Sequence, residues 1–427
     1  MKTPFNAFVM ACALALLTAS TSAQADDAAL IKRGEYLAKA GDCIACHATP
    51  NSKPFVGGFR MVTPMGAIYS TNITPDPETG IGRYTEADFA RALREGVAKD
   101  GHNLYPAMPY PSYAKVNDDD VHALYVYFMK GVAPVKQANR ESDIKWPLNM
   151  RWPLMFWNMV FLHKGAYENK PDKDVAWNRG AYLIQGLGHC GACHTPRGIG
   201  FQEKALDESG GLYLAGAPVD NWFASNLTGD PNAGLGRWSE ADIAQFLKTG
   251  ANQHAAAFGG MTSVINNSTQ SMSDTDTAAI ARYLKSLPAV GGSGEPAYAY
   301  DPKATKVSLT RPANDAGART YTTFCMHCHG PDGRGFAPVL APLAGNPNVL
   351  EKQSLSLINV TLNGTEDLVI AGIPAPYRMP AFASVLDDQQ IADVLTFIRA
   401  GWNNGAPSIS PHEVEELRHV YEKSTGQ

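Results

Sequence analysis

One cysteine motif, repeated three times, constrains this chain more than any other feature. The pattern C-x-x-C-H occurs at residues 43–47, 190–194 and 325–329, and it accounts for six of the seven cysteines. This pattern is the attachment signature of c-type haem, because the two thiols reach the vinyl groups on one edge of a porphyrin and the following histidine lies under the iron. We therefore expect three covalently bound haem c groups. The expected attachment residues are Cys43, Cys46, Cys190, Cys193, Cys325 and Cys328, and the expected proximal iron ligands are His47, His194 and His329.

Three other interpretations of these cysteines agree less well with the pattern. A disulfide framework does not require a histidine after every second cysteine. Zinc needs four nitrogen or sulfur ligands per site, and three C-x-x-C pairs divide awkwardly among tetrahedral sites. A redox-active C-x-x-C occurs once in a βαβ unit rather than three times in helical surroundings.

The N-terminus has the pattern of an export signal. Lys2 precedes an apolar stretch at residues 8–17, and small residues at 22–25 follow it. A basic start, a short apolar core and an A-x-A ending are typical of a secretory signal, so we expect residues 1–25 to be removed after Ala25, together with Cys12. Haem attachment of this kind takes place outside the bacterial cytoplasm, which agrees with export. The most apolar later stretch, residues 150–162, is shorter than the roughly 20 residues that span a bilayer.

The charge of the chain gives no indication of nucleic-acid binding. Its formal net charge is -5 and its pI is about 6.1, whereas a nucleic-acid-binding protein carries a basic excess. No carboxylate pair, nucleophile triad or phosphate-binding loop stands out either. The sequence therefore predicts no catalytic residues on this chain.

An internal repeat surrounds the first two haem motifs. The run R-G-x-Y-L at Arg33 returns at Arg179, and the run N-I-T-P-D-P-E-T-G-I-G-R-Y from Asn72 returns in similar form from Asn226. Each long run is followed by a helix start with a serine or threonine cap and an acidic first turn. Apolar residues at helical spacing then predict a closing helix near residues 121–128, 280–287 and 391–398. The pattern predicts an all-α fold built from tandem repeats.

Each repeat resembles a class I cytochrome c domain, in which the first and last helices cross closely. The resemblance implies that Gly34 and Gly180 allow this approach, with Tyr125 and Tyr283 as their partners. The expected order is signal peptide 1–25, cytochrome c domain 26–140, aromatic linker 141–175, second domain 176–290, irregular linker 291–316, third domain 317–402 and polar tail 403–427. In the tail, Ser410 and Glu413 form a capping-box pattern that predicts a brief helix.

A methionine is the expected second axial ligand of each iron, because His/Met ligation is common in electron-transfer haems. Met108, Met261 and Met379 each precede a closing helix, and proline or glycine residues stand beside all three. The offset from Met108 to Met261 is 153, close to the 154 between Asn72 and Asn226. Met272 and His254 remain alternatives in the second repeat, and His102 in the first.

The whole mature sequence resembles the tri-haem cytochrome c subunits of membrane-bound bacterial dehydrogenases. The resemblance rests on the two runs described above and on L-Y-P-A-M-P-Y-P-S-Y-A-K from Leu104, R-W-P-L from Arg151, N-R-G-A-Y-L from Asn178 and C-H-T-P-R-G from Cys193. Members serve quinoprotein alcohol dehydrogenases or flavoprotein gluconate, sorbitol, fructose or glucose dehydrogenases. The resemblance implies that electrons leave a catalytic subunit, pass along the haems and reach ubiquinone or an oxidase, and it allows a small third subunit. It also implies a peripheral location on the periplasmic side of the inner membrane.

Two further functions and one structural question stay open. The chain could be a free-standing periplasmic electron carrier or an oxidase-linked cytochrome, or a haem enzyme such as a peroxidase, which would need an open sixth position at one iron. Some family members attach to the membrane through an extended amphipathic C-terminal region, whereas the tail here is short and polar. Attachment then depends on a partner or on the aromatic segment 146–161, for which packing between domains is the favoured alternative.

Overall fold

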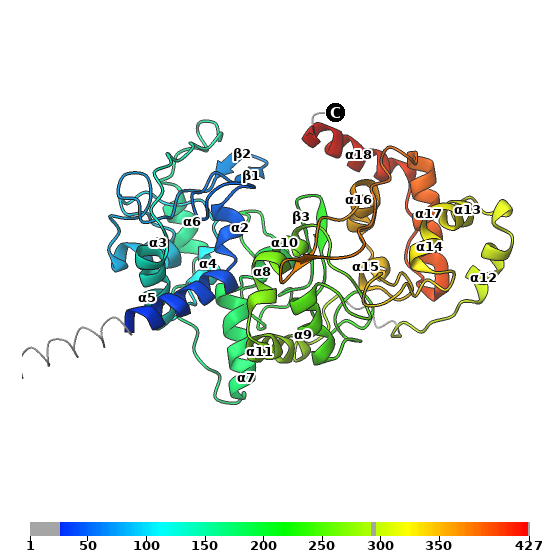
Figure 1. Cartoon of the computed structure of the whole chain (residues 1–427), viewed down its shortest axis with the longest axis horizontal. Coiled ribbons are helices and arrows are strands. Elements are labelled where there is room, and N and C mark those ends of the chain that lie inside the picture. Colours follow the sequence, from blue (N-terminus) through cyan, green and yellow to red (C-terminus); the bar gives the residue numbers. More distant parts are fainter. Residues whose placement is uncertain (1–25, 292–295, 426–427) are drawn as a thin grey trace, which may run out of the picture. The chain divides into compact units, whose positions relative to one another are not determined.

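The computed structural model describes residues 26–291 and 296–425 (Figure 1). The predicted export signal, residues 1–25, lies outside them. The chain divides into two compact units, with the boundary between Tyr167 and Glu168. Helices dominate, and the strands of the described residues form three short antiparallel hairpins. The predicted all-α class is therefore confirmed.

The first unit contains the first haem motif. Its elements are a helix over residues 26–40, α2 (Cys43–His47), β1 (Arg60–Thr63), β2 (Gly66–Tyr69), α3 (Glu86–Glu95), α4 (Tyr110–Tyr113), α5 (Asp118–Val126), the π-helical turn η1 (Tyr127–Gly131) and α6 (Leu154–Phe161). The loops between these elements are long.

The second unit contains both remaining haem motifs. Around the second motif lie α7 (Val175–Tyr182), η2 (Leu183–Leu187), α8 (Gly191–His194), β3 (Ala217–Val219), β4 (Trp222–Ala224), α9 (Glu240–Thr249), α10 (Gly260–Asn267), η3 (Thr269–Ser271) and α11 (Asp274–Lys285). Around the third lie α12 (Lys303–Thr310), η4 (Pro312–Asn314), α13 (Ala316–Thr320), η5 (Tyr321–Cys325), α14 (Met326–His329), α15 (Pro347–Leu350), α16 (Leu355–Asn363), β5 (Val369–Ile370), β6 (Ile373–Pro374), α17 (Asp388–Ala400), η6 (Gly401–Asn403) and α18 (Pro411–Thr425).

A close helix crossing recurs three times, and a glycine lies at each. A Cβ atom on Gly34 would lie 2.1 Å from the carbonyl oxygen of Ala123, and one on Gly180 would lie 2.0 Å from that of Ala279. The third case is Gly317, at 2.4 Å from the carbonyl oxygen of Asp393. No side chain fits in these positions, so the predicted crossing is confirmed at Gly34 and Gly180.

The partner expected for Gly34 was wrong. A Cβ atom there would lie 2.4 Å from Cβ of Tyr127, not beside Tyr125, whose hydroxyl donates to the carbonyl of Tyr84. The two tyrosines are two residues apart on one helix, and a rotation of about 200° separates them. Tyr283, the partner expected for Gly180, does contact it: the distance to its Cβ would be 2.9 Å.

The arginine beside each of the first two glycines pairs with an aspartate on the crossing helix. Nε and a terminal nitrogen of Arg33 donate to Asp120 at 3.0 and 2.6 Å, and Arg179 makes a two-pronged pair with Asp276 at 2.8 and 2.8 Å. Both aspartates are buried. The repeated R-G pair thus combines a charge-assisted contact with the space for close approach.

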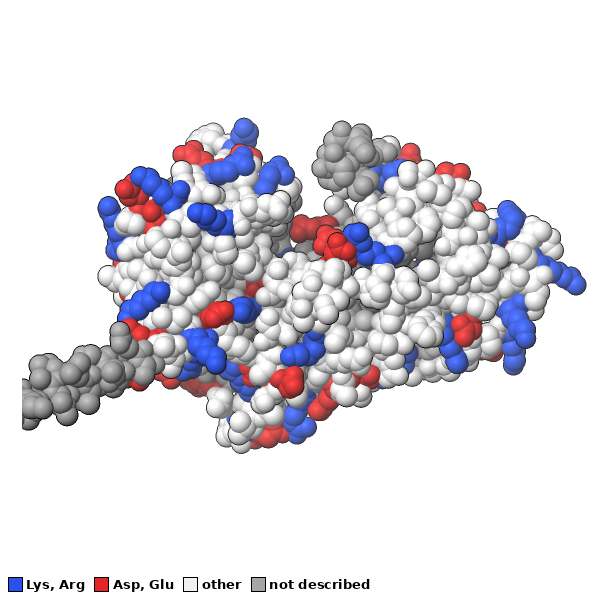
Figure 2. Space-filling model, in the orientation of Figure 1, with Lys and Arg blue, Asp and Glu red and all other residues white. Residues whose placement is uncertain are grey.

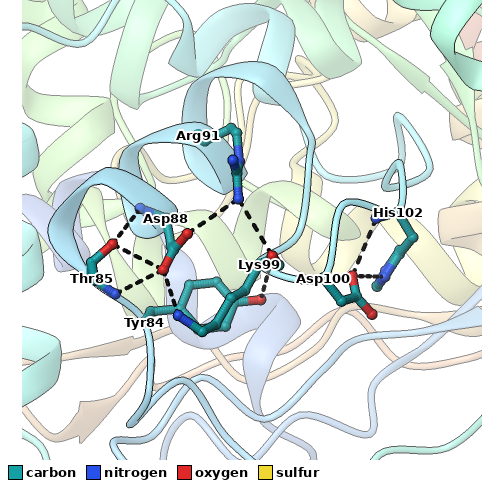
Figure 3. Close-up of polar contacts among 7 residues, drawn as sticks. All are labelled: Tyr84, Thr85, Asp88, Arg91, Lys99, Asp100 and His102. Atoms are coloured by element: carbon teal, nitrogen blue, oxygen red, sulfur yellow. Dashed lines mark hydrogen bonds and ion pairs between the residues drawn. The ribbon is translucent and has the colours of Figure 1, made fainter.

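The serine or threonine caps predicted after the two long runs are both present, each as part of a capping box. The Thr85 side chain accepts from the backbone of Asp88 at the start of α3, and Ser239 accepts from that of Asp242 at the start of α9. Around Asp88, Arg91 donates at 3.1 Å and Lys99 at 2.7 Å (Figure 3). The bond from Lys99, followed by the bonds from the backbone and hydroxyl of Thr85, lowers the pKa of Asp88 to about 2.

Regular structure occurs in segments that were expected to be irregular. Helix α12 lies inside 291–316, and its buried Thr305 accepts a hydrogen bond from the backbone of Trp402. We define the first, second and third segments as the parts of the chain around the first, second and third haem motifs, residues 26–140, 176–290 and 296–425. The capped helix expected near Ser410 is present as α18 and is longer than predicted. Its Val414 is fully buried in the core of the third segment. Tertiary packing stabilises both helices, because each buries a side chain, Thr305 or Val414, against other elements.

Candidate functional site

The three haem motifs have the same local structure. The histidine of each motif ends a short helix, α2, α8 or α14, and the two thiols of every motif are not joined in a disulfide. The first cysteine is half-buried and the second is exposed in all three. Burial raises the pKa of Cys43, Cys190 and Cys325 to about 12 each, so these groups are neutral thiols at pH 7.

Each motif histidine has one ring nitrogen bonded to a backbone carbonyl. Nδ1 of His47 lies 2.7 Å from the carbonyl oxygen of Thr71, Nδ1 of His194 lies 2.7 Å from that of Ser225, and Nδ1 of His329 lies 2.9 Å from that of Ala341. A carbonyl only accepts, so Nδ1 carries the proton and Nε2 is the nitrogen with a free lone pair. This bond fixes the ring orientation and raises ligand basicity, as at other metal-binding histidines.

Burial lowers the pKa of all three histidines, although their bonds to the carbonyls act in the opposite direction. The imidazole therefore stays neutral to lower pH than an exposed histidine would. Neutral imidazole is the form that ligates a metal. Free thiols, neutral histidines and a fixed Nε2 fit a covalently attached haem at each motif.

Met108 and Met379 lie in irregular backbone, as expected. Met108 is half-buried directly before α4. Met379 is held by two backbone bonds to Thr365, one from its amide to the hydroxyl and one to its carbonyl, each 3.0 Å long. Its side chain contacts the same core cluster as Cys325. This contact brings the predicted ligand and the third haem motif to one core.

The second segment differs from expectation around its methionines. Met261 lies in the first turn of helix α10 instead of an irregular loop, and it is half-buried. Met272 is the more buried of the two, directly before α11. His254 stacks on the ring of Trp238 with ring centroids 5.3 Å apart. The three candidates therefore have different surroundings, and all remain candidate ligands.

His102, the alternative ligand in the first segment, has another partner. It is exposed, and its Nδ1 lies 2.6 Å from a carboxylate oxygen of Asp100 (Figure 3). His327, inside the third motif, is also exposed. Neither has the half-buried, carbonyl-bonded environment of the motif histidines.

One buried donor of the second segment has no protein partner. Nε1 of Trp238 is buried without a hydrogen bond. Trp238 is the last residue of the long run that begins at Asn226. An unpaired buried N–H is unfavourable unless a ligand accepts from it. A haem carries carboxylates that can accept such a bond, which is a further point of fit.

The sequence motifs do not indicate which carbonyls accept from the histidines. Thr71 and Ser225 each precede a repeated asparagine, Asn72 or Asn226, so the repeat was the available signal. The backbone carbonyl, not the side chain, makes the contact, and side-chain identity therefore carries no trace of it. Ala341 of the third segment has no counterpart in the repeat.

Comparison with known proteins relates the chain to haem proteins. A family model described as cytochrome c matches residues 178–288 and 315–402. The chain is 52% identical over 415 residues to the gluconate 2-dehydrogenase cytochrome c subunit of Pantoea cypripedii, covering 95% of this chain and 94% of that one. It is 49% identical to the cytochrome c subunit of the quinone alcohol dehydrogenase of Komagataeibacter europaeus, covering 96% and 88%. It is 37% identical to the fructose dehydrogenase cytochrome subunit of Gluconobacter japonicus, covering 91% and 82%.

Proposed function

This chain belongs to the family of cytochrome c subunits of dehydrogenases, and from that premise we propose that it conducts electrons through three covalently bound haem c groups. The chain is an electron-transfer subunit, and substrate oxidation takes place on a different subunit. The observation that carries the proposal is the threefold recurrence of one geometry: free thiols beside a histidine whose Nδ1 is bonded to a carbonyl.

The proposed sites are assigned residue by residue. Each pair of motif cysteines would hold one haem, with His47, His194 and His329 as proximal ligands and Met108, Met261 and Met379 opposite them. The haem supplies one-electron redox chemistry, and the protein sets its ligation, orientation and burial. These three sites lie in proposed cytochrome c domains at 26–140, 176–290 and 317–402.

The proposed partner is a catalytic dehydrogenase subunit, as the names of the relatives indicate for those proteins. We place the complex on the periplasmic side of the inner membrane, with ubiquinone or an oxidase as acceptor. On the face shown in Figure 2, basic and acidic side chains are interspersed. This face therefore presents no single large patch of one charge to a partner.

Affinity purification of the full-length exported protein from its native host tests the function. We expect three haems per chain by mass spectrometry, and a co-purifying flavoprotein or quinoprotein that reduces the haems when its substrate is added. Fewer than three haems would refute the tri-haem assignment. Three haems without any associated dehydrogenase would favour a free-standing carrier instead.

The ligand of the second iron is tested by comparing two methionine variants. If Met261 is the ligand, Met261→Ala replaces strong-field thioether ligation, so the low-spin spectrum of one haem is lost and its potential falls. Met272→Ala, the matched control, should lower the stability of the fold by about 2 kcal/mol or more through cavity formation while leaving the spectrum unchanged. The opposite pattern, measured by absorption spectroscopy and redox titration, would assign Met272.

An apolar surface on the first unit supports membrane attachment. Helix α6 is held from one side, where Asn158 accepts from the hydroxyl of Tyr110 at 2.7 Å and donates to the carbonyl of Glu95 at 3.2 Å. Its other side is exposed at helical spacing. The 146–160 surface consists of Trp146, Leu148, Trp152, Met155, Phe156, Met159 and Val160, each at least half exposed, with Trp146 at 77% and Met159 at 74%.

The charge around this surface matches an anionic lipid bilayer. Residues 144–167 contain no aspartate or glutamate, whereas they include Lys145, Arg151 and Lys164. Tryptophan at the margins and basic residues beside an apolar helix face are typical of segments that lie in a membrane interface. We therefore propose that the 146–160 surface rests on the bilayer. No helix of the described residues is apolar and long enough to cross one.

Vesicle sedimentation measures this attachment. The haem-loaded protein should bind phosphatidylcholine vesicles that contain phosphatidylglycerol, and salt should weaken the binding because it screens the lysines and arginine. The double variant Trp152→Ser, Met159→Ser should lose most of the binding. Ile199→Ser, at a fully exposed isoleucine of the second unit, is the matched control and should bind normally. The proposal would be overturned if the double variant bound vesicles as well as the unmodified protein does. It would also be overturned if the double variant kept vesicle binding but no longer bound the dehydrogenase subunit.

A further inference from the structure

Ser225 makes two hydrogen bonds that join the second and third segments. Its carbonyl oxygen accepts from Nδ1 of His194 at 2.7 Å. Its hydroxyl donates to the side-chain oxygen of Asn348 at 2.8 Å. The residue that orients the second motif histidine is therefore itself held by the third segment.

Asn348 belongs to the part of the third segment that holds His329. The backbone N–H of Asn348 donates to the side-chain oxygen of Asn346 at 2.9 Å. The side-chain nitrogen of Asn346 donates to the carbonyl of Pro342, also at 2.9 Å. The neighbouring carbonyl, that of Ala341, accepts from Nδ1 of His329 at 2.9 Å. A continuous run of hydrogen bonds and short backbone segments thus connects the two motif histidines.

The first segment provides a natural comparison. Thr71 occupies the position of Ser225, since each directly precedes the repeated asparagine, and its carbonyl accepts from His47 at the same distance of 2.7 Å. Thr71 is exposed, whereas Ser225 is half-buried. The two sites therefore share the bond from histidine to a backbone carbonyl, but Thr71 and Ser225 differ in their exposure to solvent.

A second group of contacts joins the same two segments elsewhere. The side chain of Asn266, on α10, donates to the carbonyl of Asp367 and accepts from the amide of Val369, both at 2.8 Å. These bonds attach the β5–β6 hairpin to α10. They hold the segments together without touching either motif histidine, and they therefore offer a control for the contact at Ser225.

We propose that Ser225 and Asn348 are positioning residues through which the third segment sets the ligand strength of His194. The inference rests on the proposed function, since it takes His194 as a haem ligand. A firm bond from Nδ1 to a fixed carbonyl makes the imidazole a stronger donor and stabilises the ferric state. Once Asn348 no longer holds Ser225, the carbonyl is free to move, the bond weakens and the potential of the second haem rises.

The test is redox titration of the holoprotein, combined with NMR of its ferrous form to follow hydrogen exchange at the Nδ1 protons of the ligand histidines. Ser225→Ala removes the hydroxyl and leaves the carbonyl in place. We expect a positive shift in the potential of one haem and faster exchange of one Nδ1 proton, with the other two haems unchanged. Ser225→Thr keeps a hydroxyl and should restore both values, because Thr71 shows that the repeat accepts threonine at this position.

Two control variants separate positioning from general loosening. Asn266→Ala removes two bonds between the same segments and should leave the potential of the second haem unchanged. Thr71→Ala should leave that of the first unchanged. An unshifted potential in Ser225→Ala, or an equal shift in Asn266→Ala, would overturn the proposal. Haem content is measured first by mass spectrometry, so that a missing haem, which would refute the proposed function, is told apart from an unshifted one.

Discussion

Replacing both Cys190 and Cys193 by alanine is expected to remove one haem from the exported protein and to leave the other two attached. In the function proposed above, the thioether bonds to the second haem form at these two thiols, which are not joined in a disulfide. Without them His194 loses the anchored iron that it is oriented to bind. Mass spectrometry should show a chain lighter by one haem, and electron flow from the dehydrogenase to the acceptor should fall sharply.

The seventh cysteine provides the control for this experiment. Cys12 lies in the predicted export signal, so Cys12→Ala should leave the mass, spectrum and haem content of the mature protein unchanged. An unchanged haem content in the double variant would contradict the assignment of the second motif. A mature chain that retains Cys12 would contradict the predicted cleavage site.

Replacing Gly180 by valine should destabilise the second unit by about 3 kcal/mol, at the upper end of the range for overpacked cores. Any Cβ atom there would lie 2.0 Å from the carbonyl oxygen of Ala279, so helices α7 and α11 would have to separate. Separation also strains the pair between Arg179 and Asp276. Valine has a better helix propensity than glycine, by a few tenths of a kcal/mol, which is too little to compensate.

Gly211 is a matched control for this substitution. It lies in the same unit, and a Cβ atom built on it would have nothing within 4 Å. Gly211→Val should therefore change the free energy of unfolding by no more than about 0.5 kcal/mol. Urea unfolding followed by circular dichroism measures both variants. If the two substitutions had equal effects, the close crossing would not be what Gly180 provides.

Features that depend on neighbouring residues could be predicted from the sequence. The capping boxes at Thr85 and Ser239 need only four consecutive residues, and both are present. The glycines of the repeated R-G pairs indicated a close crossing because glycine is unfavourable inside a helix without a reason. The crossing partner of Gly34 was predicted wrongly, since the choice between Tyr125 and Tyr127 depends on how the helix is rotated in the fold.

Features that depend on distant residues could not be predicted. His194 is bonded to the carbonyl of Ser225, and Ser225 to Asn348, which lies 123 residues further along the chain. Helix α12 lies in a stretch that was expected to be irregular because glycine, serine and proline are frequent in it. Its buried Thr305, which accepts a hydrogen bond from the distant Trp402, indicates what stabilises the helix. Met261 likewise lies in a helix whose start no local capping residue announces.

By itself the sequence predicted the chemistry, since thiols and a histidine at fixed spacing on one short segment are already close together before the chain folds. It also determined the all-α class, through helical periodicity and caps that act within a few residues. Only the tertiary structure decided which carbonyl orients each histidine, how closely paired helices approach and which part of α6 stays exposed. Those outcomes depend on contacts between residues far apart in the chain. Many such contacts contribute to the free energy of folding together, so no short sequence motif indicates any one of them.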